Sequence, residues 1–174
     1  MADRLRRLAN LGLLQLAVVA PLLLARPQPI AAALVGWIAC ALQLVMSRGR
    51  TGELHLLIVG GLLGSGIEWG ATATGLMAFQ SDGIAGMPFW LFPSWAMLGV
   101  SFCYCLSFLR GRPVLATVVG AIGCGASLRL AETVGEIAVP DPTRFVAVAA
   151  LLGMTIGVLS ILAEPRSSIA PTDA

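Results

Sequence analysis

Six apolar segments, separated by short polar stretches, make up almost the whole chain of 174 residues. They cover residues 8–25, 30–46, 54–79, 89–109, 113–137 and 145–163. Each is close to the ~20 residues that a helix needs to cross ~30 Å of hydrocarbon. A strand with open edges would leave its backbone groups unsatisfied there, and the segments lack the alternation of a transmembrane barrel. The pattern therefore predicts an all-α, polytopic transmembrane bundle of about six helices.

The connections between these segments are too short to form an additional domain. The longest covers residues 80–88 and contains the turn formers Gly83 and Gly86. Pro113 is well placed to open the fifth helix, because proline at the first helical position has no hydrogen bond to lose. We predict a single transmembrane domain over residues 1–163 and a short cytoplasmic tail over residues 164–174.

The composition agrees with a membrane protein. Hydrophobic residues make up 57% of the chain and charged residues only 11%, with one histidine. A soluble domain has roughly a quarter charged residues, and a chain of this size could not bury so much apolar surface.

The distribution of arginine predicts the orientation. With a cytoplasmic N-terminus and six crossings, the cytoplasmic segments contain most of the basic residues: Arg4, Arg6, Arg7, Arg48, Arg50, Arg110, Arg112 and Arg166. The external loops contain only Arg26 and Arg144. Because basic residues favour the cytoplasmic side, this asymmetry predicts that both termini are cytoplasmic.

Two places within the apolar segments contain ionisable side chains. Glu68 lies roughly 20 Å along the third helix, and Arg129 lies roughly 24 Å along the fifth, which runs in the same direction. Charged groups at this depth are costly and are by default candidates for function. The similar depths suggest an ion pair between Glu68 and Arg129, although Glu132, three residues after Arg129, is an alternative partner within the same helix.

We define the candidate polar centre by five residues: Glu68, Thr72, Trp95, Arg129 and Glu132. Two interpretations are open. These groups either hold the helices together, or they line a polar cavity, open to the outer face, that binds a headgroup, a proton or a small polar substrate. Under the second interpretation Trp95 covers the site, and Glu68 is the candidate acid or base of an enzyme.

Small and uncharged polar residues also occur within the helices. Gly60 and Gly64 form a small-xxx-small pair, as do Gly66 and Gly70. Such pairs permit close contact between helices, either within the chain or in an oligomer. Asn10, Gln15 and Gln43 are expected to form hydrogen bonds across helices. We expect membrane lipids as partners, and a second membrane protein is a further candidate.

Several chemistries find no support in the sequence. Cys103 and Cys105 lie two apart, on nearly opposite sides of a helix, and make a poor chelate or disulfide. No zinc-binding cluster, phosphate-binding loop or basic nucleic-acid patch is present. The sequence therefore indicates no metal, no cofactor and no nucleic-acid partner.

Several motifs resemble one family. They are Asn10-x4-Gln15, Glu53-Leu54, glycine-rich residues before Glu68 with Gly75 after it, Pro88-x-Trp90-Leu91-x3-Trp95, and Leu109-x2-Arg112-x3-Ala116-x3-Gly120-Ala121. Together they resemble the DUF2878 family of small bacterial inner-membrane proteins over nearly the whole chain. Arg129 departs from the family pattern, in which we expect an uncharged or aromatic residue.

The resemblance implies a multi-pass protein of the bacterial inner membrane whose role is not characterised. It suggests a lipid-binding or accessory protein linked to membrane lipid metabolism. One alternative is a membrane enzyme that modifies a fatty-acyl, isoprenoid or carotenoid substrate, with Glu68 as acid or base. A second is a transporter of small solutes.

Overall fold

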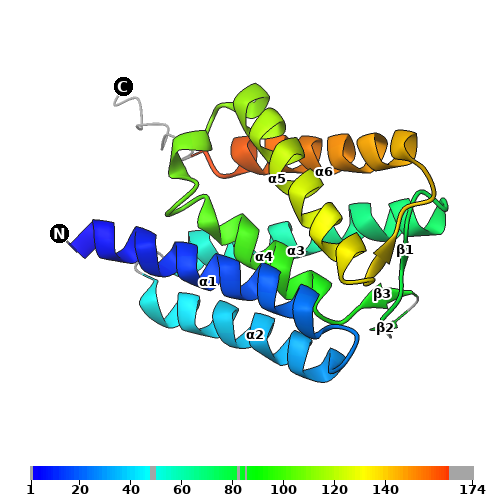
Figure 1. Ribbon diagram of the computed structural model, residues 1–174. Helices are drawn as coiled ribbons and strands as arrows, with labels where there is room; N and C mark the ends of the chain where they lie inside the picture. Colours follow the sequence, from blue (N-terminus) through cyan, green and yellow to red (C-terminus); the bar gives the residue numbers. More distant parts are fainter. Residues whose placement is uncertain (1, 48–49, 82, 85, 165–174) are drawn as a thin grey trace.

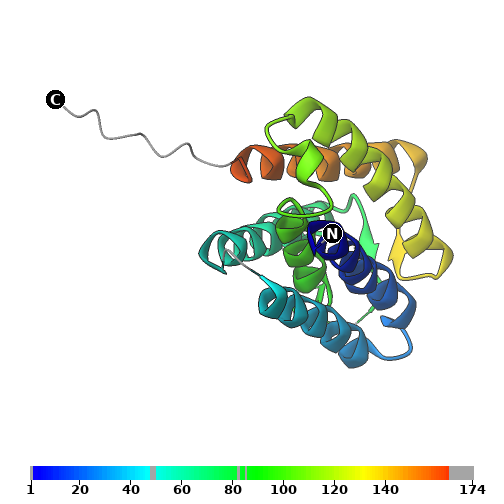
Figure 2. The same cartoon turned by 90° about the vertical axis from the view of Figure 1, so that its left-hand side faces the viewer.

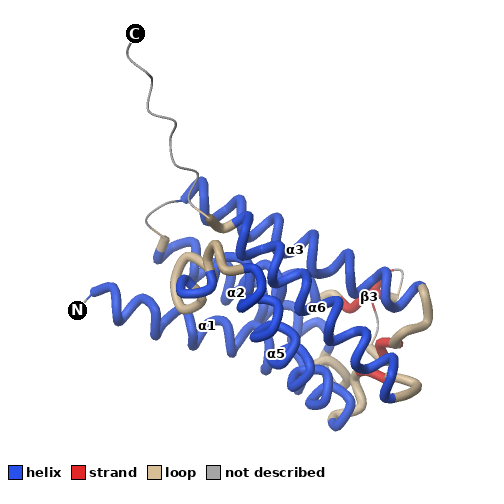
Figure 3. The backbone as a smooth tube through the Cα atoms, turned by 90° about the horizontal axis from the view of Figure 1, so that it is seen from above, coloured by secondary structure: helices blue, strands red, loops and turns tan. Residues whose placement is uncertain are grey.

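The computed structural model describes residues 2–47, 50–81, 83–84 and 86–164 (Figure 1). Arg48 and Arg166, and all of the expected tail except Glu164, lie outside the described residues. Both ends of the described chain lie at one end of the bundle, and short strands lie at the other, which we call the strand end (Figures 1 and 3). A chain that crosses the membrane an even number of times must have both of its ends on the same side.

The described part contains six α-helices, one short 3₁₀ helix and four two-residue strands. The elements are α1 (Ala2–Leu24), α2 (Pro29–Met46), α3 (Arg50–Ala73), β1 (Ala78–Phe79), β2 (Gly83–Ile84), β3 (Met87–Pro88), α4 (Leu91–Ser101), η1 (Ser107–Leu109), α5 (Pro113–Thr133), β4 (Ile137–Ala138) and α6 (Pro142–Leu162). The all-α, six-helix prediction is confirmed.

Five of the helices are long and apolar enough to cross a membrane: α1, α2, α3, α5 and α6. Their outward faces carry large exposed apolar side chains such as Ile30, Leu62 and Val114. Water would disfavour this surface, whereas lipid matches it. The chain is a multi-pass membrane protein.

The fourth helix is shorter than the sequence indicated. α4 ends at Ser101, whereas the apolar segment continues to Leu109. With 11 residues, it is only about 16 Å long. Nine of the 11 residues are buried, because α4 lies in the middle of the bundle (Figure 2). A helix that is apolar on all sides and surrounded by protein does not need the length of a lipid-exposed span.

Irregular backbone completes the crossing after α4. Tight turns satisfy its amide groups: Cys103 N donates to Val100 O, and Leu106 N to Ser101 O, both at 2.9 Å. Phe102 and Leu109, at the two ends of this segment, have no exposed surface. Between them, residues 103–107 are half-buried and Phe108 is exposed. The non-helical backbone is tolerated here because its amide groups are paired within these turns.

Helices α3 and α5 each end at a glycine with a positive φ angle. Gly75 has φ +72° and Gly135 has φ +75°, a conformation that favours glycine. Beyond them, Leu76 N donates to Ala71 O at 2.9 Å and Glu136 N donates to Ala131 O at 2.8 Å. This Schellman pattern ends α3 at Ala73 and α5 at Thr133, before the predicted limits of 79 and 137.

The chain segments that leave these helices pair with each other. β1 and β4 are antiparallel, with Ala78 opposite Ala138 and Phe79 opposite Ile137. Gln80 N also donates to Glu136 O at 2.8 Å. We call this β1–β4 pair the clasp, because it joins the outgoing ends of α3 and α5 at the strand end (Figure 1).

Glycines allow α4 to pack closely against α3. A Cβ atom at Gly60 would lie 2.8 Å from both Gly99 Cα and the Trp95 carbonyl oxygen. Gly64 faces the same helix. In contrast, a Cβ atom at Gly66 or Gly70 would meet nothing within 4 Å. The first glycine pair therefore serves packing within the chain, and the second remains open.

The same principle joins α5 to α6. A Cβ atom at Gly153 would lie 2.7 Å from the Thr117 carbonyl oxygen. α5 and α6 form an antiparallel pair that lies along one side of the other four helices (Figure 2). α5 has few direct contacts with α1, so the pair leaves space beside α1 and α4.

Uncharged polar residues cross-link the helices as predicted at two of three positions. Asn10 Nδ2 donates to Gln43 Oε1 at 3.1 Å, joining α1 to α2, and both residues are buried. Asn10 Oδ1 also accepts from Cys105 N at 3.3 Å. Gln15 is an exception: it lies beside the cavity described below.

We predict that Gly60→Ala destabilises the folded protein by about 1–3 kcal/mol, because the methyl group would meet backbone atoms that cannot move independently. The matched control is Gly66→Ala in the same helix, where the position is open and alanine favours the helix by about 0.5–1 kcal/mol. Unfolding in mixed detergent micelles with increasing dodecyl sulfate measures both. Equal stability of the two variants would contradict this account of the α3–α4 interface.

Candidate functional site

A cavity of about 310 Å³ lies between the α5–α6 pair and the rest of the bundle. Ligand sites in proteins start at about this size. Helices α1, α3, α4, α5 and α6 contribute to its wall, together with the turn before α5 and the strand β4. Most of the lining is aliphatic: Leu14, Val18, Val19, Leu22, Leu91, Leu98, Leu106, Leu109, Val119, Leu128, Ala131, Ile137, Leu152 and Ile156. This cavity, which we call the chamber, is thus mainly apolar, and it is open on one side, where Gln15, Val119 and Gly123 are exposed.

The carboxyl group of Glu68 forms part of this wall. Glu68 is buried, and its Oε1 accepts a hydrogen bond of 2.6 Å from Trp95 Nε1. A Cβ atom at Gly64 would overlap the indole ring of Trp95. Gly64 and Glu68 are one helical turn apart on α3, so the same helix face provides the space for the indole ring and the acceptor for its N–H group. Of the five residues of the polar centre, Glu68 and Trp95 are the two that line the cavity.

Other polar groups line the cavity near Glu68. Gln15 on α1 and Cys124 and Ser127 on α5 belong to the wall. Ser94 also lines the cavity. Its hydroxyl is already engaged with the backbone, since it lies within hydrogen-bonding distance of Ala17 O at 2.6 Å and of Trp90 O at 2.9 Å. Sequence reasoning did not assign Ser127 or Gln15 to the site. Their helical spacing alone does not show which side of the helix faces a cavity.

Thr72 does not contribute to the cavity wall. Its hydroxyl donates to the Glu68 carbonyl oxygen at 3.0 Å, within the same helix. This hydrogen bond to the preceding turn is common for threonine in helices. The residue shares the helix face of Glu68, as expected, but acts on the backbone.

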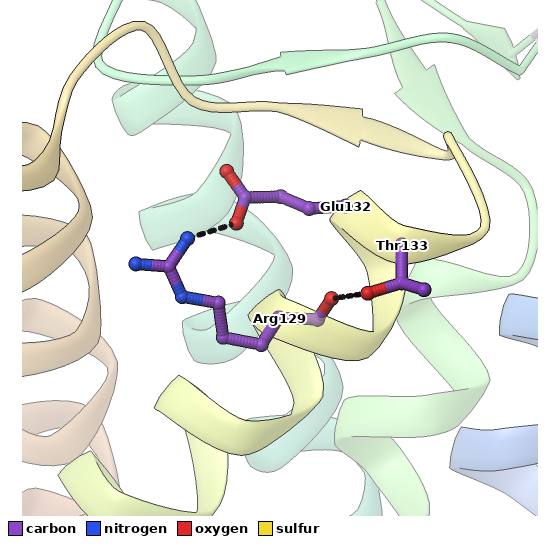
Figure 4. Close-up of polar contacts among 3 residues, drawn as sticks. All are labelled: Arg129, Glu132 and Thr133. Carbon is purple, nitrogen blue, oxygen red and sulfur yellow. Dashed lines mark hydrogen bonds and ion pairs between the residues drawn. The ribbon is translucent and has the colours of Figure 1, made fainter.

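The predicted ion pair between Glu68 and Arg129 is wrong. Arg129 Nη1 contacts Glu132 Oε2 at 2.7 Å instead (Figure 4). The Arg129 guanidinium also lies 3.9 Å from the centre of the Phe145 ring, and its side chain is 62% exposed. The reason is helix rotation: Leu128 faces the cavity, and the next residue points about 100° away from it.

Glu136 forms a second buried acidic site, at the strand end. Its side chain has no exposed surface, and one carboxyl oxygen accepts a hydrogen bond from the Ser81 hydroxyl. The predicted fifth helix, residues 113–137, included Glu136, but α5 ends at Thr133, before it. Gly135 is the signal that could have indicated this, since a glycine commonly follows the last turn of a helix.

Burial raises the pKa of the Glu136 carboxyl group above its usual value of 4.5. The Ser81 hydroxyl, the Trp90 indole N–H and the Arg26 guanidinium each lower that pKa, but burial is the larger effect. Among the described residues, Trp90 Nε1 and Glu136 Oε2 are both buried without a hydrogen-bond partner. The indole N–H therefore lowers the pKa of the carboxyl group by lying near it and not by forming a hydrogen bond.

The cysteines are free, and none of the four forms a disulfide. Among the described residues, no group of three or more His, Cys, Asp or Glu side chains is placed to hold a metal ion.

A comparison with protein families gives one match. The family described as "Protein of unknown function (DUF2878)" matches residues 7–158. The chain matches no curated protein and no solved structure. The match includes all of the cavity-lining residues.

We predict that Glu136→Gln stabilises the protein relative to wild type at about pH 8 and has little effect at about pH 4. A carboxyl group whose pKa is raised by folding stabilises the folded state below the unfolded pKa of 4.5. That stability is lost as the pH rises through the folded-state pKa. Glutamine does not ionise, so it avoids the loss. Unfolding in detergent at both pH values measures the difference.

The control for this prediction is Glu164→Gln, which removes a carboxyl group from an exposed position. It should follow wild type at both pH values, because substitutions of exposed groups usually change stability by less than about 0.5 kcal/mol. A Glu136→Gln variant that is less stable at the higher pH would show that the carboxylate is favoured at this position.

Proposed function

Because the chain belongs to the DUF2878 family, whose function is unknown, we propose a role from the cavity itself: the protein binds one lipid-soluble molecule beside Glu68. The observation that carries this proposal is a chamber of about 310 Å³ with an aliphatic wall and one buried carboxyl group. The chamber is open toward the lipid-facing side, where Gln15, Val119 and Gly123 are exposed. A concave, mainly apolar space of this size with a few polar groups is typical of a ligand site.

The setting of the chamber favours a membrane-derived ligand. Four of the five helices that are long and apolar enough to cross a membrane, α1, α3, α5 and α6, line the cavity. Its wall consists mainly of leucine, isoleucine and valine side chains. An apolar ligand dissolved in the bilayer gains dispersion contacts in such a chamber. The protein is therefore proposed as a lipid-binding or accessory protein of membrane lipid metabolism, in the bacterial inner membrane.

An enzyme is the second candidate, and the position of Glu68 favours it. A carboxyl group in the wall of a cavity lies within reach of a bound substrate and can transfer a proton. For an enzyme that modifies a fatty-acyl or isoprenoid chain, Glu68→Gln would abolish turnover while binding is retained. The transporter alternative requires alternating access from both sides of the membrane, and solute flux into vesicles is its test.

We predict that the purified protein retains a bound lipid-soluble molecule, and that Gly123→Phe releases it. Gly123 lines the cavity, and a side chain there would meet no protein atom within 4 Å at its Cβ position. A phenyl ring can therefore enter the chamber without disturbing the fold. Native mass spectrometry in detergent, followed by lipid extraction, measures the occupancy.

The matched control for Gly123→Phe is Gly66→Phe, which adds the same ring to an open glycine on α3 that does not line the cavity. Occupancy should be unchanged in this variant. The same spectra report the oligomeric state, and a dimer lost in Gly66→Phe would identify the open face of Gly66 and Gly70 as an interface between copies. An empty wild-type protein that also fails to take up added lipid would contradict the proposal.

We also propose that both termini are cytoplasmic, on the basis of the arginine distribution. A reporter enzyme that is active only outside the cytoplasm should be silent when fused after Ala163 and active when fused within the 80–88 connection. Activity at the C-terminal fusion would reverse the assigned orientation. The two fusions control for each other, because they lie at opposite ends of the bundle (Figure 1).

A further inference from the structure

The polar groups of the chamber are concentrated near the middle of its length. Four of them come from four different helices: Gln15 from α1, Glu68 from α3, Trp95 from α4 and Ser127 from α5. Aliphatic side chains continue in both directions from this level. Toward the strand end they are Leu22, Ala131 and Ile137, and toward the termini they are Leu106, Leu109, Val119 and Ile156. An occupant would meet polar atoms at one level and hydrocarbon elsewhere.

The charge at this level is acidic and has no basic counterpart. No arginine, lysine or histidine is among the described residues that line the cavity. Arg129, the cation that the sequence predicted beside Glu68, has an exposed side chain that pairs with Glu132. A bound carboxylate or phosphate would therefore be desolvated without a compensating charge, which is a large cost in an apolar interior.

The carboxyl group of Glu68 can accept further hydrogen bonds in addition to the one from Trp95. A carboxylate has two oxygens and about four acceptor positions, and the indole N–H occupies one position on Oε1. A hydroxyl group on the ligand can donate to the remaining acceptor capacity. A cationic amine would also be attracted, but its desolvation offsets much of that attraction in a buried site.

The chamber also reaches the lipid-facing surface between α1 and α5. Val119 lines the cavity and is nevertheless 38% exposed. Gln15, on the other side of this opening, is exposed at the middle of α1. Gly123 adds no side chain between them. The side-chain amide of Gln15 is costly at hydrocarbon depth when it faces only lipid. At the opening, it can form a hydrogen bond with a polar ligand that passes.

We infer that the occupant is an uncharged long-chain alcohol that enters from the bilayer between α1 and α5 and donates its hydroxyl hydrogen bond to Glu68. This inference rests on the proposed binding function and specifies its ligand class. The chain lies along the aliphatic wall, and the hydroxyl group lies at the level of Glu68 and Gln15.

Three probes of equal chain length test the ligand class: hexadecanol, hexadecanoate and hexadecylamine. Binding to the full-length wild-type protein in detergent is measured by native mass spectrometry and by tryptophan fluorescence. We expect the alcohol to bind at least about tenfold more tightly than the acid or the amine. Tighter binding of the acid or the amine, or equal binding of all three, would overturn the inference and leave the binding function intact.

Glu68→Gln tests the assigned hydrogen bond. Glutamine keeps a carbonyl oxygen for Trp95 but replaces the second acceptor by an amide donor. We expect alcohol binding to weaken about tenfold and the preference for alcohol over acid to decrease. Glu132→Gln makes the same substitution outside the cavity and should leave all three affinities unchanged. An unaltered preference in a folded Glu68→Gln variant would also overturn the inference.

Gly123→Phe separates this inference from the proposed function. The ring should weaken binding of all three probes, because it takes space inside the chamber, and should slow their association, because it narrows the opening between α1 and α5. If no probe binds wild type, and the protein is empty as purified, both the binding function and the inference fail. If probes bind wild type but associate equally fast with Gly123→Phe, the route between α1 and α5 is wrong.

Discussion

The hydrogen bond between Trp95 and Glu68 is the contact on which the chamber depends. A buried carboxyl group in a membrane protein needs a donor, and an indole N–H in the bundle centre needs an acceptor. Gly64 permits the approach by leaving space for the ring on the same face of α3. The pair joins the central helix α4 to α3 while both side chains remain in the cavity wall. A structural contact and a binding surface are therefore formed by the same atoms.

The helices were largely predictable because hydropathy is a property of segments. Five of the six apolar segments became helices long enough to span a bilayer. The fourth could not be distinguished from the others, since hydropathy is the same for a residue that faces lipid and one that faces protein. Its short length follows from burial on all sides. The early ends of α3 and α5 were encoded locally, by Gly75 and Gly135.

The site was only partly predictable because it depends on helix rotation. Depth along a helix is a simple function of residue number, and it correctly identified Glu68 as an interior group. Depth does not show which way a side chain points. Arg129, for which a similar depth was predicted, has an exposed side chain that contacts Phe145. Trp95 was a candidate near the site, yet its donor role required the contact geometry of α3 and α4, which no single segment contains.

The clasp at the strand end has a consequence for how related chains can differ in length. Gly75 lies seven positions after Glu68, just beyond the end of α3, and Gly135 lies seven positions after Leu128, just beyond the end of α5. Each glycine ends its helix and sets the register of the strand that follows. An inserted residue within either stretch would rotate a cavity side chain by about 100° and shift the strand pairing at the same time. The chamber and the clasp therefore constrain both intervals together, whereas an insertion within the connection of residues 80–88 would leave both unchanged.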